Sequence, residues 1–296
     1  MKYVVTGGAG HITKPLAEKL LAAGHEVTVI GRDAAKLQSL VEKGAKAAVG
    51  SVEDPSFLTT AFAGADAVYL MIPPNFGVTD WLGYQKKVAD YFVQAVKPNQ
   101  IKKVVVLSSV GAHMRKGAGP VDGLAYLEQQ LENAGTDNKF LRPSYFYYNL
   151  FGQIPLIKGM GIMGANMGSP DTKLVLTHTS EIADAAAEEL LSLSFTGSSV
   201  RYIASDERST IEIANVLGNA IGKESLQWIP FSDEQMKGGL LQAGLAEVFA
   251  QGYTEMGIAL RSGEMEADYW NNRPAKLGNI KLEDFAKEFA AVFNAS

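Results

Sequence analysis

Glycine residues near the start of the chain give the clearest indication of chemistry in the sequence. They follow the short apolar run 3–6 and precede a helical pattern over 15–23. In this context Gly7 allows a tight turn, and Gly10 lets the backbone approach a pyrophosphate. An ordinary strand–helix turn would also use glycine, but the position after the first strand of an alternating chain favours a dinucleotide site. The residues expected to bind the cofactor here are Gly7, Gly10, His11, Ile12 and Thr13.

The end of the second predicted strand bears on which dinucleotide is bound. An NAD site carries an acidic residue there to hold the ribose hydroxyls. This sequence has Arg32 and Asp33 at that point, with Lys36 one turn into the next helix. Arg32 and Lys36 can grip a 2′-phosphate, whereas Asp33 is left with two roles, a helix cap or a ribose contact. We therefore expect NADP(H) in preference to NAD(H).

These residues must be positioned by an alternation of strands and helices. The pattern predicts strands over 3–6, 26–30, 45–49, 67–72, 103–108 and 139–142. Helices are predicted between them over 15–23, 34–43, 55–62, 84–96 and 124–133. Continuous apolar strands separated by amphipathic helices are typical of a parallel sheet covered on both faces. The predicted fold is therefore α/β, a Rossmann doubly wound parallel sheet with a smaller, mostly helical second lobe.

The second half of the sequence is less regular. We expect residues 1–150 to form the NADP-binding domain, to which 179–205 return a helix and a strand. Residues 151–178 and 206–296 would form the smaller, substrate-covering lobe, with helices over 210–221, 233–242, 246–259 and 282–293. The glycine- and methionine-rich segment 151–169 shows no clear periodicity, so it is expected to be a loop.

Composition excludes several classes of function. The chain has 296 residues, a formal net charge of −5, no cysteine and four histidines without metal-ligand spacing. No basic stripe suited to nucleic acid is present, and no thiolate chemistry or zinc site is expected. No signal peptide or membrane span is predicted, so the expected location is cytoplasmic and no membrane partner is expected.

Taken together, several motifs resemble the NmrA-like, atypical short-chain dehydrogenase/reductases. The similarity spans nearly the whole chain. The motifs are Thr6-Gly7-Gly8-Ala9-Gly10-His11-Ile12-Thr13, Gly31-Arg32-Asp33, Leu70-Met71-Ile72-Pro73-Pro74, Ser108-Ser109, Leu141-Arg142-Pro143-Ser144-Tyr145-Phe146 with Asn149, and Asp284-Phe285. Members of this family include NADPH-dependent quinone and triphenylmethane-dye reductases, and redox sensors that bind the cofactor without turning it over.

The resemblance also implies roles for individual residues. Met71, Ile72 and Pro73 would pass beside the adenosine and ribose, and Ser51 would lie near the adenine, where relatives often have Asp. Ser108 would belong to the cofactor site, and the nicotinamide end would be lined by Pro143, Ser144 and Tyr145.

Proton-transfer machinery is less clear than cofactor binding. Many short-chain dehydrogenases use Tyr-x-x-x-Lys, in which the lysine lowers the pKa of the tyrosine. Tyr126 lies in the corresponding helix, but Gln130 stands where the lysine should be. Tyr126 is therefore a weak catalytic candidate, and a packing role is favoured.

The hydride chemistry belongs to the cofactor, so the protein need only orient an acceptor. Phe76, Tyr145, Tyr148 and Phe151 are candidate substrate contacts, suited to a flat, small aromatic acceptor held between the sheet and the helical lobe. A packing seam between the lobes would explain the same aromatic residues equally well. The leading hypothesis is an NADPH-dependent oxidoreductase acting on a quinone-like or dye-like molecule. The alternative is a non-enzymatic NADP(H) sensor with a protein partner. A sugar-nucleotide epimerase is disfavoured by Arg32 and Gln130.

Overall fold

The chain folds into two compact units, which the computed structural model describes over residues 1–296. We call them the sheet unit and the second unit. The sheet unit comprises 1–109, 122–142 and 182–201, and the second unit comprises 110–121, 143–181 and 202–296. Residues 110–121 and 143–150, which the sequence placed with the first domain, thus fall in the second unit.

The sheet unit alternates strands and helices along the chain. Its elements are β1 (Lys2–Val5), α1 (Thr13–Ala22), β2 (Glu26–Gly31), α2 (Ala34–Val41), β3 (Lys46–Val49), α3 (Pro55–Ala61), β4 (Ala67–Leu70), α4 (Trp81–Val96), β5 (Lys103–Leu107), α5 (Asp122–Glu132), β6 (Asp137–Pro143), most of α7 (Thr179–Ser192) and most of β10 (Ser198–Ile203).

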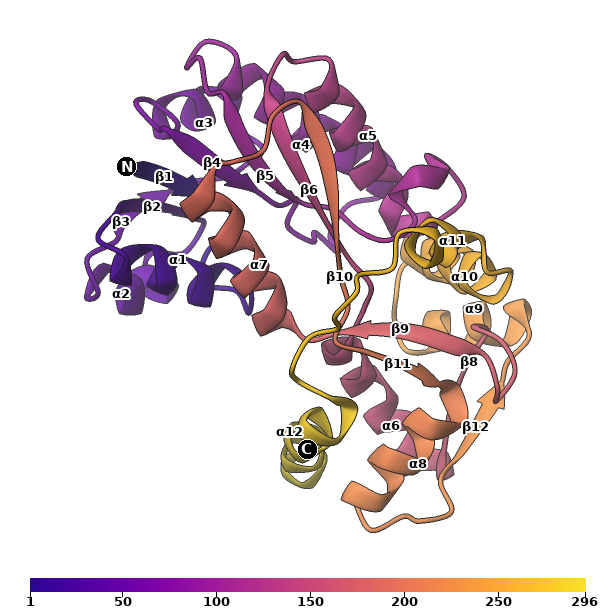
Figure 1. Ribbon diagram of the computed structural model, residues 1–296. Helices are drawn as coiled ribbons and strands as arrows, with labels where there is room; N and C mark the ends of the chain where they lie inside the picture. Colours follow the sequence, from indigo (N-terminus) through magenta and orange to yellow (C-terminus); the bar gives the residue numbers. More distant parts are fainter. The chain divides into compact units, whose positions relative to one another are not determined.

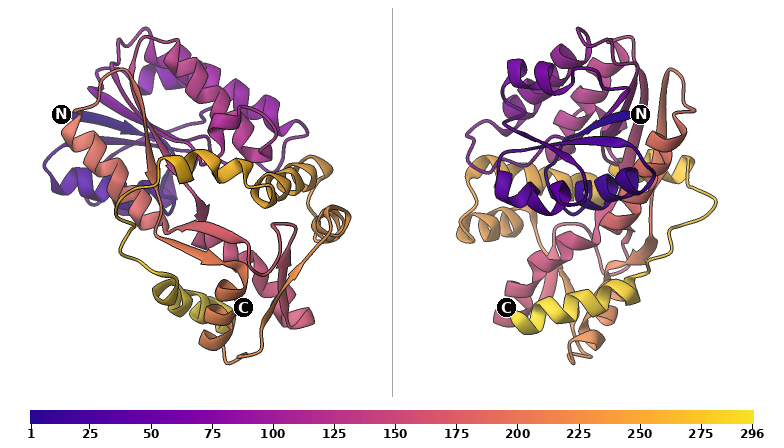
Figure 2. Two further views of the ribbon diagram at one scale, coloured as in Figure 1. Left: turned by 45° about the vertical axis from the view of Figure 1, so that its right-hand side comes forward. Right: turned by 90° about the vertical axis from the view of Figure 1, so that its left-hand side faces the viewer.

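The seven strands form one sheet in the order β10-β6-β5-β4-β1-β2-β3. From β3 to β6 every neighbouring pair is parallel, which gives the predicted doubly wound arrangement. Strand β4 is buried along its whole length because helices cover both faces of the sheet. Figures 1 and 2 show α1, α2 and α7 on one face and α3, α4 and α5 on the other. The carboxyl ends of β1 to β6 therefore meet at one edge, where ligands of such sheets bind.

Short polar side chains fix where three of these helices begin. Asp33, Asp54 and Asp80 are the N-cap residues of α2, α3 and α4, and each carboxylate accepts backbone N–H groups of the first turn. Such a cap satisfies donors that have no partner within the helix. Helix α1 has no side-chain cap, which leaves its first N–H groups available.

The second unit combines helices with two small sheets. Its elements are the 3₁₀ helices η1 (Ala112–Met114), η2 (Gly119–Val121) and η3 (Tyr147–Gln153), the strands β7 (Tyr145–Phe146), β8 (Ile162–Ala165), β9 (Lys173–Thr177), β11 (Asp206–Ser209) and β12 (Gln227–Pro230), and the helices α6 (Ile154–Met160), α8 (Thr210–Ala220), α9 (Asp233–Gln242), α10 (Glu247–Arg261), α11 (Glu264–Asn271) and α12 (Leu282–Ala295).

The expectation of a loop over 151–169 is wrong. This segment holds most of η3, helix α6 and strand β8, and β8 pairs in parallel with β12. The other small sheet has the order β11-β9-β7. These strands are short and their partners lie far along the chain, so local periodicity did not reveal them. No helix in the chain is both long enough and apolar enough to span a membrane.

Candidate functional site

A cavity of about 500 Å³ lies at the carboxyl edge of the sheet unit. Its walls come from the loops that follow β1, β2, β3 and β4. The lining residues are Gly7, Gly8, Ala9, Gly10, Lys14, Ile30, Gly31, Arg32, Asp33, Lys36, Leu37, Ser39, Gly50, Ser51, Val52, Glu53, Pro73 and Tyr84. Of the predicted cofactor-binding residues, the cavity brings together Gly7, Gly10, Arg32, Lys36, Ser51 and Pro73.

The turn after β1 can be built only with glycine at its first position. Gly7 has φ +102°, and a Cβ there would lie 2.4 Å from Thr13 Oγ1 and 2.5 Å from Met71 Sδ. The Thr13 hydroxyl donates to the carbonyl oxygen of Thr6 at 2.9 Å, which ties the start of α1 to the end of β1. Thr13 and Met71 therefore shape the turn from behind and do not line the cavity.

The start of α1 offers free hydrogen-bond donors. The Gly8 N–H donates to Ile30 O at 2.9 Å, and the Gly10 N–H donates to Gly7 O at 3.3 Å. The N–H groups of Ala9, Ile12 and Thr13 donate to no other group of the chain. An uncapped helix N-terminus with free N–H groups binds an anion through these donors and the helix dipole.

The wall formed by the end of β2 and the start of α2 is cationic. Arg32 and Lys36 line the cavity, and neither side chain forms a hydrogen bond or an ion pair within the chain. The Asp33 carboxylate accepts the N–H groups of Ala35 at 2.9 Å and Lys36 at 3.4 Å, so it serves as the cap of α2. This contact favours the capping role over a ribose contact. The cavity thus presents two unneutralised cations where an NAD site would present a free carboxylate.

The opposite wall carries the residues after β3 and β4. Ser51 Oγ accepts the N–H of Glu53 at 3.1 Å, and the Tyr84 hydroxyl donates to Pro73 O at 2.9 Å. Burial, helped by Glu53 and opposed by Arg32, raises the pKa of Tyr84 to about 12. Tyr84 therefore stays protonated and braces the Pro73 backbone. Met71 and Ile72 precede Pro73, but they are absent from the lining.

Ser108 belongs to a buried polar network further along the same edge. Its hydroxyl donates to Glu128 on α5, whose two carboxylate oxygens accept from Arg142 Nε at 3.0 Å and Arg142 Nη2 at 2.6 Å. All three residues are buried. The bidentate ion pair satisfies both charges and commits the serine proton to the carboxylate. Ser108 does not line the cavity described above.

The contacts of Tyr126 favour a packing role for this residue. Its hydroxyl donates to Asp90 Oδ1 on α4 at 2.9 Å, and Lys86 lies over its ring, 5.4 Å from the centroid. Burial and the adjacent Asp90 raise the pKa of Tyr126. A phenol whose proton is held by a carboxylate is a poor acid, so nothing in these contacts supports the catalytic interpretation.

The residues expected at the nicotinamide end lie in the second unit. The Ser144 N–H donates to Thr177 Oγ1 at 3.0 Å, and Ser144 Oγ is buried without a partner. Tyr145 pairs with Leu176 in the sheet formed by β11, β9 and β7. Burial raises the pKa of Tyr145 well above its usual range. Pro143 is also buried, at the end of β6.

The aromatic residues divide between surface and core. Phe76 and Tyr148 are exposed, whereas Tyr147 is fully buried and stacks on Phe285 of α12 with a centroid distance of 5.1 Å. Phe151 stacks on Phe289 of the same helix at 5.9 Å. Within the second unit, Phe151 therefore packs against α12, which gives it a structural role.

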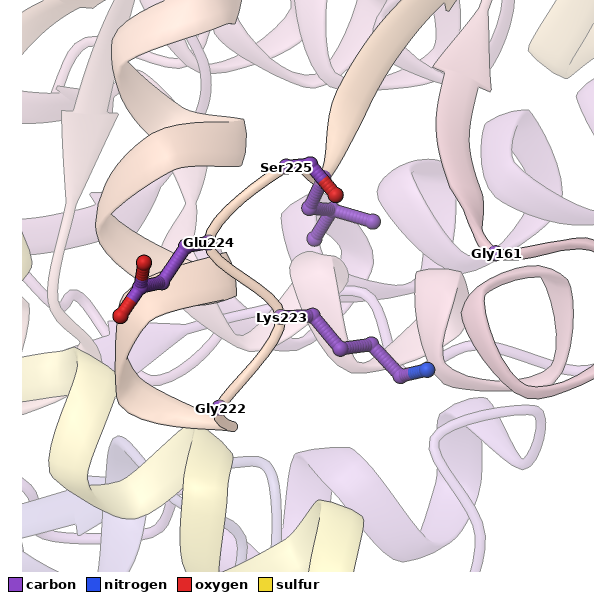
Figure 3. A pocket seen from close by; sticks show the side chains of 6 residues that line it. Gly161, Gly222, Lys223, Glu224 and Ser225 are labelled. Carbon is purple, nitrogen blue, oxygen red and sulfur yellow. The ribbon is translucent and has the colours of Figure 1, made fainter.

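A second cavity, of about 520 Å³, lies in the second unit beside the start of β12. It is lined by Gly161, Gly222, Lys223, Glu224, Ser225 and Leu226. Figure 3 shows the Lys223 and Glu224 side chains extending in different directions from the loop. Both side chains are exposed, and no buried polar group among the lining residues marks a ligand. The structure has no group of three or more acidic or histidine side chains suited to a metal ion.

The sequence motifs do not indicate every residue of the cavity. Lys14 and Tyr84 line the cavity, and neither belongs to a motif. The position of Lys14, in the first turn after the glycine loop, was the signal that could have indicated it. Tyr84 gave no such signal, because its contact with Pro73 depends on how α4 packs beside the end of β4.

The part of the chain that contains the cavity is similar to known proteins. Residues 7–153 match the family described as NAD(P)H-binding. An NAD(P)H azoreductase from Xenophilus azovorans is 25% identical over 295 residues, which cover 99% of each chain.

Two solved structures share the fold. An NADPH-dependent quinone oxidoreductase from Escherichia coli, complexed with NADPH, is 20% identical with a TM-score of 0.83, covering 97% of this chain and 99% of that one. The triphenylmethane reductase of Citrobacter sp. is 21% identical with a TM-score of 0.80, covering 98% of this chain and 100% of that one.

The residues of the cavity fit a dinucleotide. The turn at Gly7 has no room for a side chain, the N-terminus of α1 is uncapped, and Arg32 and Lys36 have no acidic partner. These features would hold a pyrophosphate and a further phosphate group. Residues 7–153, which contain the glycine loop and both cations, are similar to the NAD(P)H-binding family.

Proposed function

We propose that the protein is an NADPH-dependent reductase that transfers hydride to a quinone-, azo- or dye-type aromatic acceptor. The observation that carries the proposal is the cavity wall with Arg32 and Lys36 unpaired and Asp33 committed to the cap of α2. A carboxylate facing the ribose would repel a 2′-phosphate, whereas a free guanidinium binds it in bidentate fashion. The similarity to the azoreductase over nearly the whole chain supports the reductase activity.

The cofactor supplies the hydride, and the chain supplies binding and orientation. The overall reaction with a quinone consumes NADPH, one proton and the quinone, and yields NADP⁺ and the hydroquinone. The Tyr126 hydroxyl is engaged by Asp90, and the Ser108 proton is engaged by Glu128. Acceptors that delocalise the incoming charge suit such a protein, because they depend less on a strong acid than a simple ketone does.

The test is a titration of the purified protein with NADPH and NADH, followed by steady-state assays with a quinone, an azo dye and a triphenylmethane dye. We expect tighter binding of NADPH and turnover with at least one acceptor class. Arg32→Ala should raise the KM for NADPH by about 10- to 100-fold, with little change for NADH. Lys46→Ala, which removes an exposed cation on β3, is the matched control.

Two results would reject the reductase. Binding of NADPH without oxidation by any of the three acceptor classes would favour the non-enzymatic sensor. Failure to bind either dinucleotide would reject both functions. An unchanged KM for NADPH in the Arg32 variant would leave the reductase standing and reject the role given to that residue.

A further inference from the structure

Lys14 is a third cation on the wall of the cavity. It lies in the first turn of α1, where its N–H donates to Gly10 O at 3.0 Å. Its side chain is half-buried, lines the cavity and forms no hydrogen bond or ion pair within the chain. A partly buried lysine that forms no ion pair is available to an anionic ligand.

The helix face that carries Lys14 points toward α2. Glu18 lies one turn further along α1 on the same face, since residues four apart are neighbours on a helix. Glu18 Oε1 pairs with Lys43 Nζ at 2.8 Å, just beyond the end of α2. Lys14 is therefore on the side of α1 that faces α2, the helix that carries Lys36.

The two phosphate groups of the cofactor have different requirements. The pyrophosphate can be held at the uncapped start of α1 by the free N–H groups of Ile12 and Thr13. A 2′-phosphate is a monoester that carries close to two negative charges at neutral pH. It needs concentrated positive charge, which Arg32 and Lys36 supply beside α2.

We propose that Lys14 is the third cation of the 2′-phosphate site and a determinant of the preference for NADPH. The inference rests on the proposed use of NADPH. Arg32 and Lys36 approach from the end of β2 and the first turn of α2, and Lys14 approaches from α1. The site then balances the phosphomonoester with positive charge from two helices and the strand end.

The experiment compares two small probes by calorimetric titration of the whole chain. The probe 2′,5′-ADP carries both a 2′- and a 5′-phosphate, whereas 5′-AMP lacks the 2′-phosphate. Lys14→Met keeps the apolar stem of the side chain and removes the charge. We expect the affinity for 2′,5′-ADP to fall by about tenfold, with less than about a twofold change for 5′-AMP. Lys19→Met removes a cation from the same helix that pairs with Asp184, and it should bind both probes as the parent protein does.

Each other outcome overturns the inference. Equal losses for both probes would place Lys14 at the 5′-phosphate, and no change for either would remove it from the site. The probes report binding alone, so the result does not depend on turnover. A selective loss of 2′,5′-ADP affinity in a protein that reduces no acceptor would support the inference and reject the reductase.

Discussion

At the scale of single residues, Gly7 is constrained both by its backbone and by its neighbours. Its φ is +102°, and a Cβ would collide with Thr13 Oγ1 at 2.4 Å. We expect Gly7→Ala to lower the free energy of unfolding by about 3 kcal/mol and to abolish dinucleotide binding, because the turn must open. Gly24→Ala is the control, since Gly24 has φ +82° with no atom near an added Cβ, and it should cost only about 1 kcal/mol. Chemical unfolding of both variants checks this, and equal losses would contradict it.

Tyr126 provides a second residue-scale prediction. Its hydroxyl is engaged by Asp90, and its raised pKa makes it a weak proton donor at neutral pH. Tyr126→Phe should therefore leave kcat within about twofold of the parent value, because general acid catalysis would contribute about 100-fold or more. The measurement is the pH profile of kcat with whichever acceptor the protein reduces. A fall of 100-fold at all pH values would show that the tyrosine acts as the acid.

At the scale of elements, we expect the N-cap residue of α2 to affect the stability of the protein but not its preference between NADPH and NADH. Asp33 accepts two N–H groups of α2, so Asp33→Ala should lower the free energy of unfolding by about 1 kcal/mol. The ratio of NADPH to NADH affinity should not fall, because removing a carboxylate beside Arg32 cannot disfavour a phosphate. Thermal unfolding and titration of both dinucleotides test this together. A selective loss of NADH affinity would instead show that Asp33 contacts the ribose.

A carboxyl group on helix α11 accepts a hydrogen bond from the backbone of β9. Glu266 is buried and accepts the Val175 N–H at 3.0 Å. Burial, opposed by the hydrogen bond from Val175 and helped by Glu207, raises the pKa of Glu266 to about 7. The folded protein therefore holds this proton more tightly than the unfolded chain. The stabilisation is fully present below about pH 4.5 and is lost as the pH rises to about 7, by about 3 kcal/mol in total.

Replacing this carboxyl group by an amide tests whether Glu266 makes the stability depend on pH. Glu266→Gln keeps an oxygen for the Val175 N–H and does not ionise, so it should be more stable than the parent at pH 8 and similar to it near pH 4. Denaturant unfolding at the two pH values measures the difference. Glu264→Gln, an exposed change in the first turn of the same helix, should show no such dependence. An equal effect of Glu266→Gln at both pH values would refute the assignment.

At the scale of the whole molecule, the sequence predicts those elements whose residue pattern lies within a short stretch of the chain. The order of the sheet unit follows from periodicity and glycine spacing, which are read within about 30 residues. The strands of the second unit are short, and β8 pairs with β12, which is far away in the sequence. No local residue pattern therefore predicts them. The same limit applies to the site. Arg32 and Lys36 are close in sequence, so a local pattern indicates them, whereas Lys14 lines the same cavity only because α1 lies beside α2.

Cofactor binding should also be visible in the stability of the whole chain. A ligand that binds only the folded sheet unit stabilises it by mass action, by about 2.7 kcal/mol at 100 times its Kd. NADPH at that concentration should therefore raise the unfolding temperature, and the same concentration of NADH should raise it less, because Arg32 and Lys36 have no 2′-phosphate to bind. Hydrogen exchange should slow at the amides of β1 and β4, whose carboxyl ends carry the cavity. Equal stabilisation by the two dinucleotides would mean that these cations do not select the cofactor, and the preference for NADPH would have to be abandoned even if the pocket were correct.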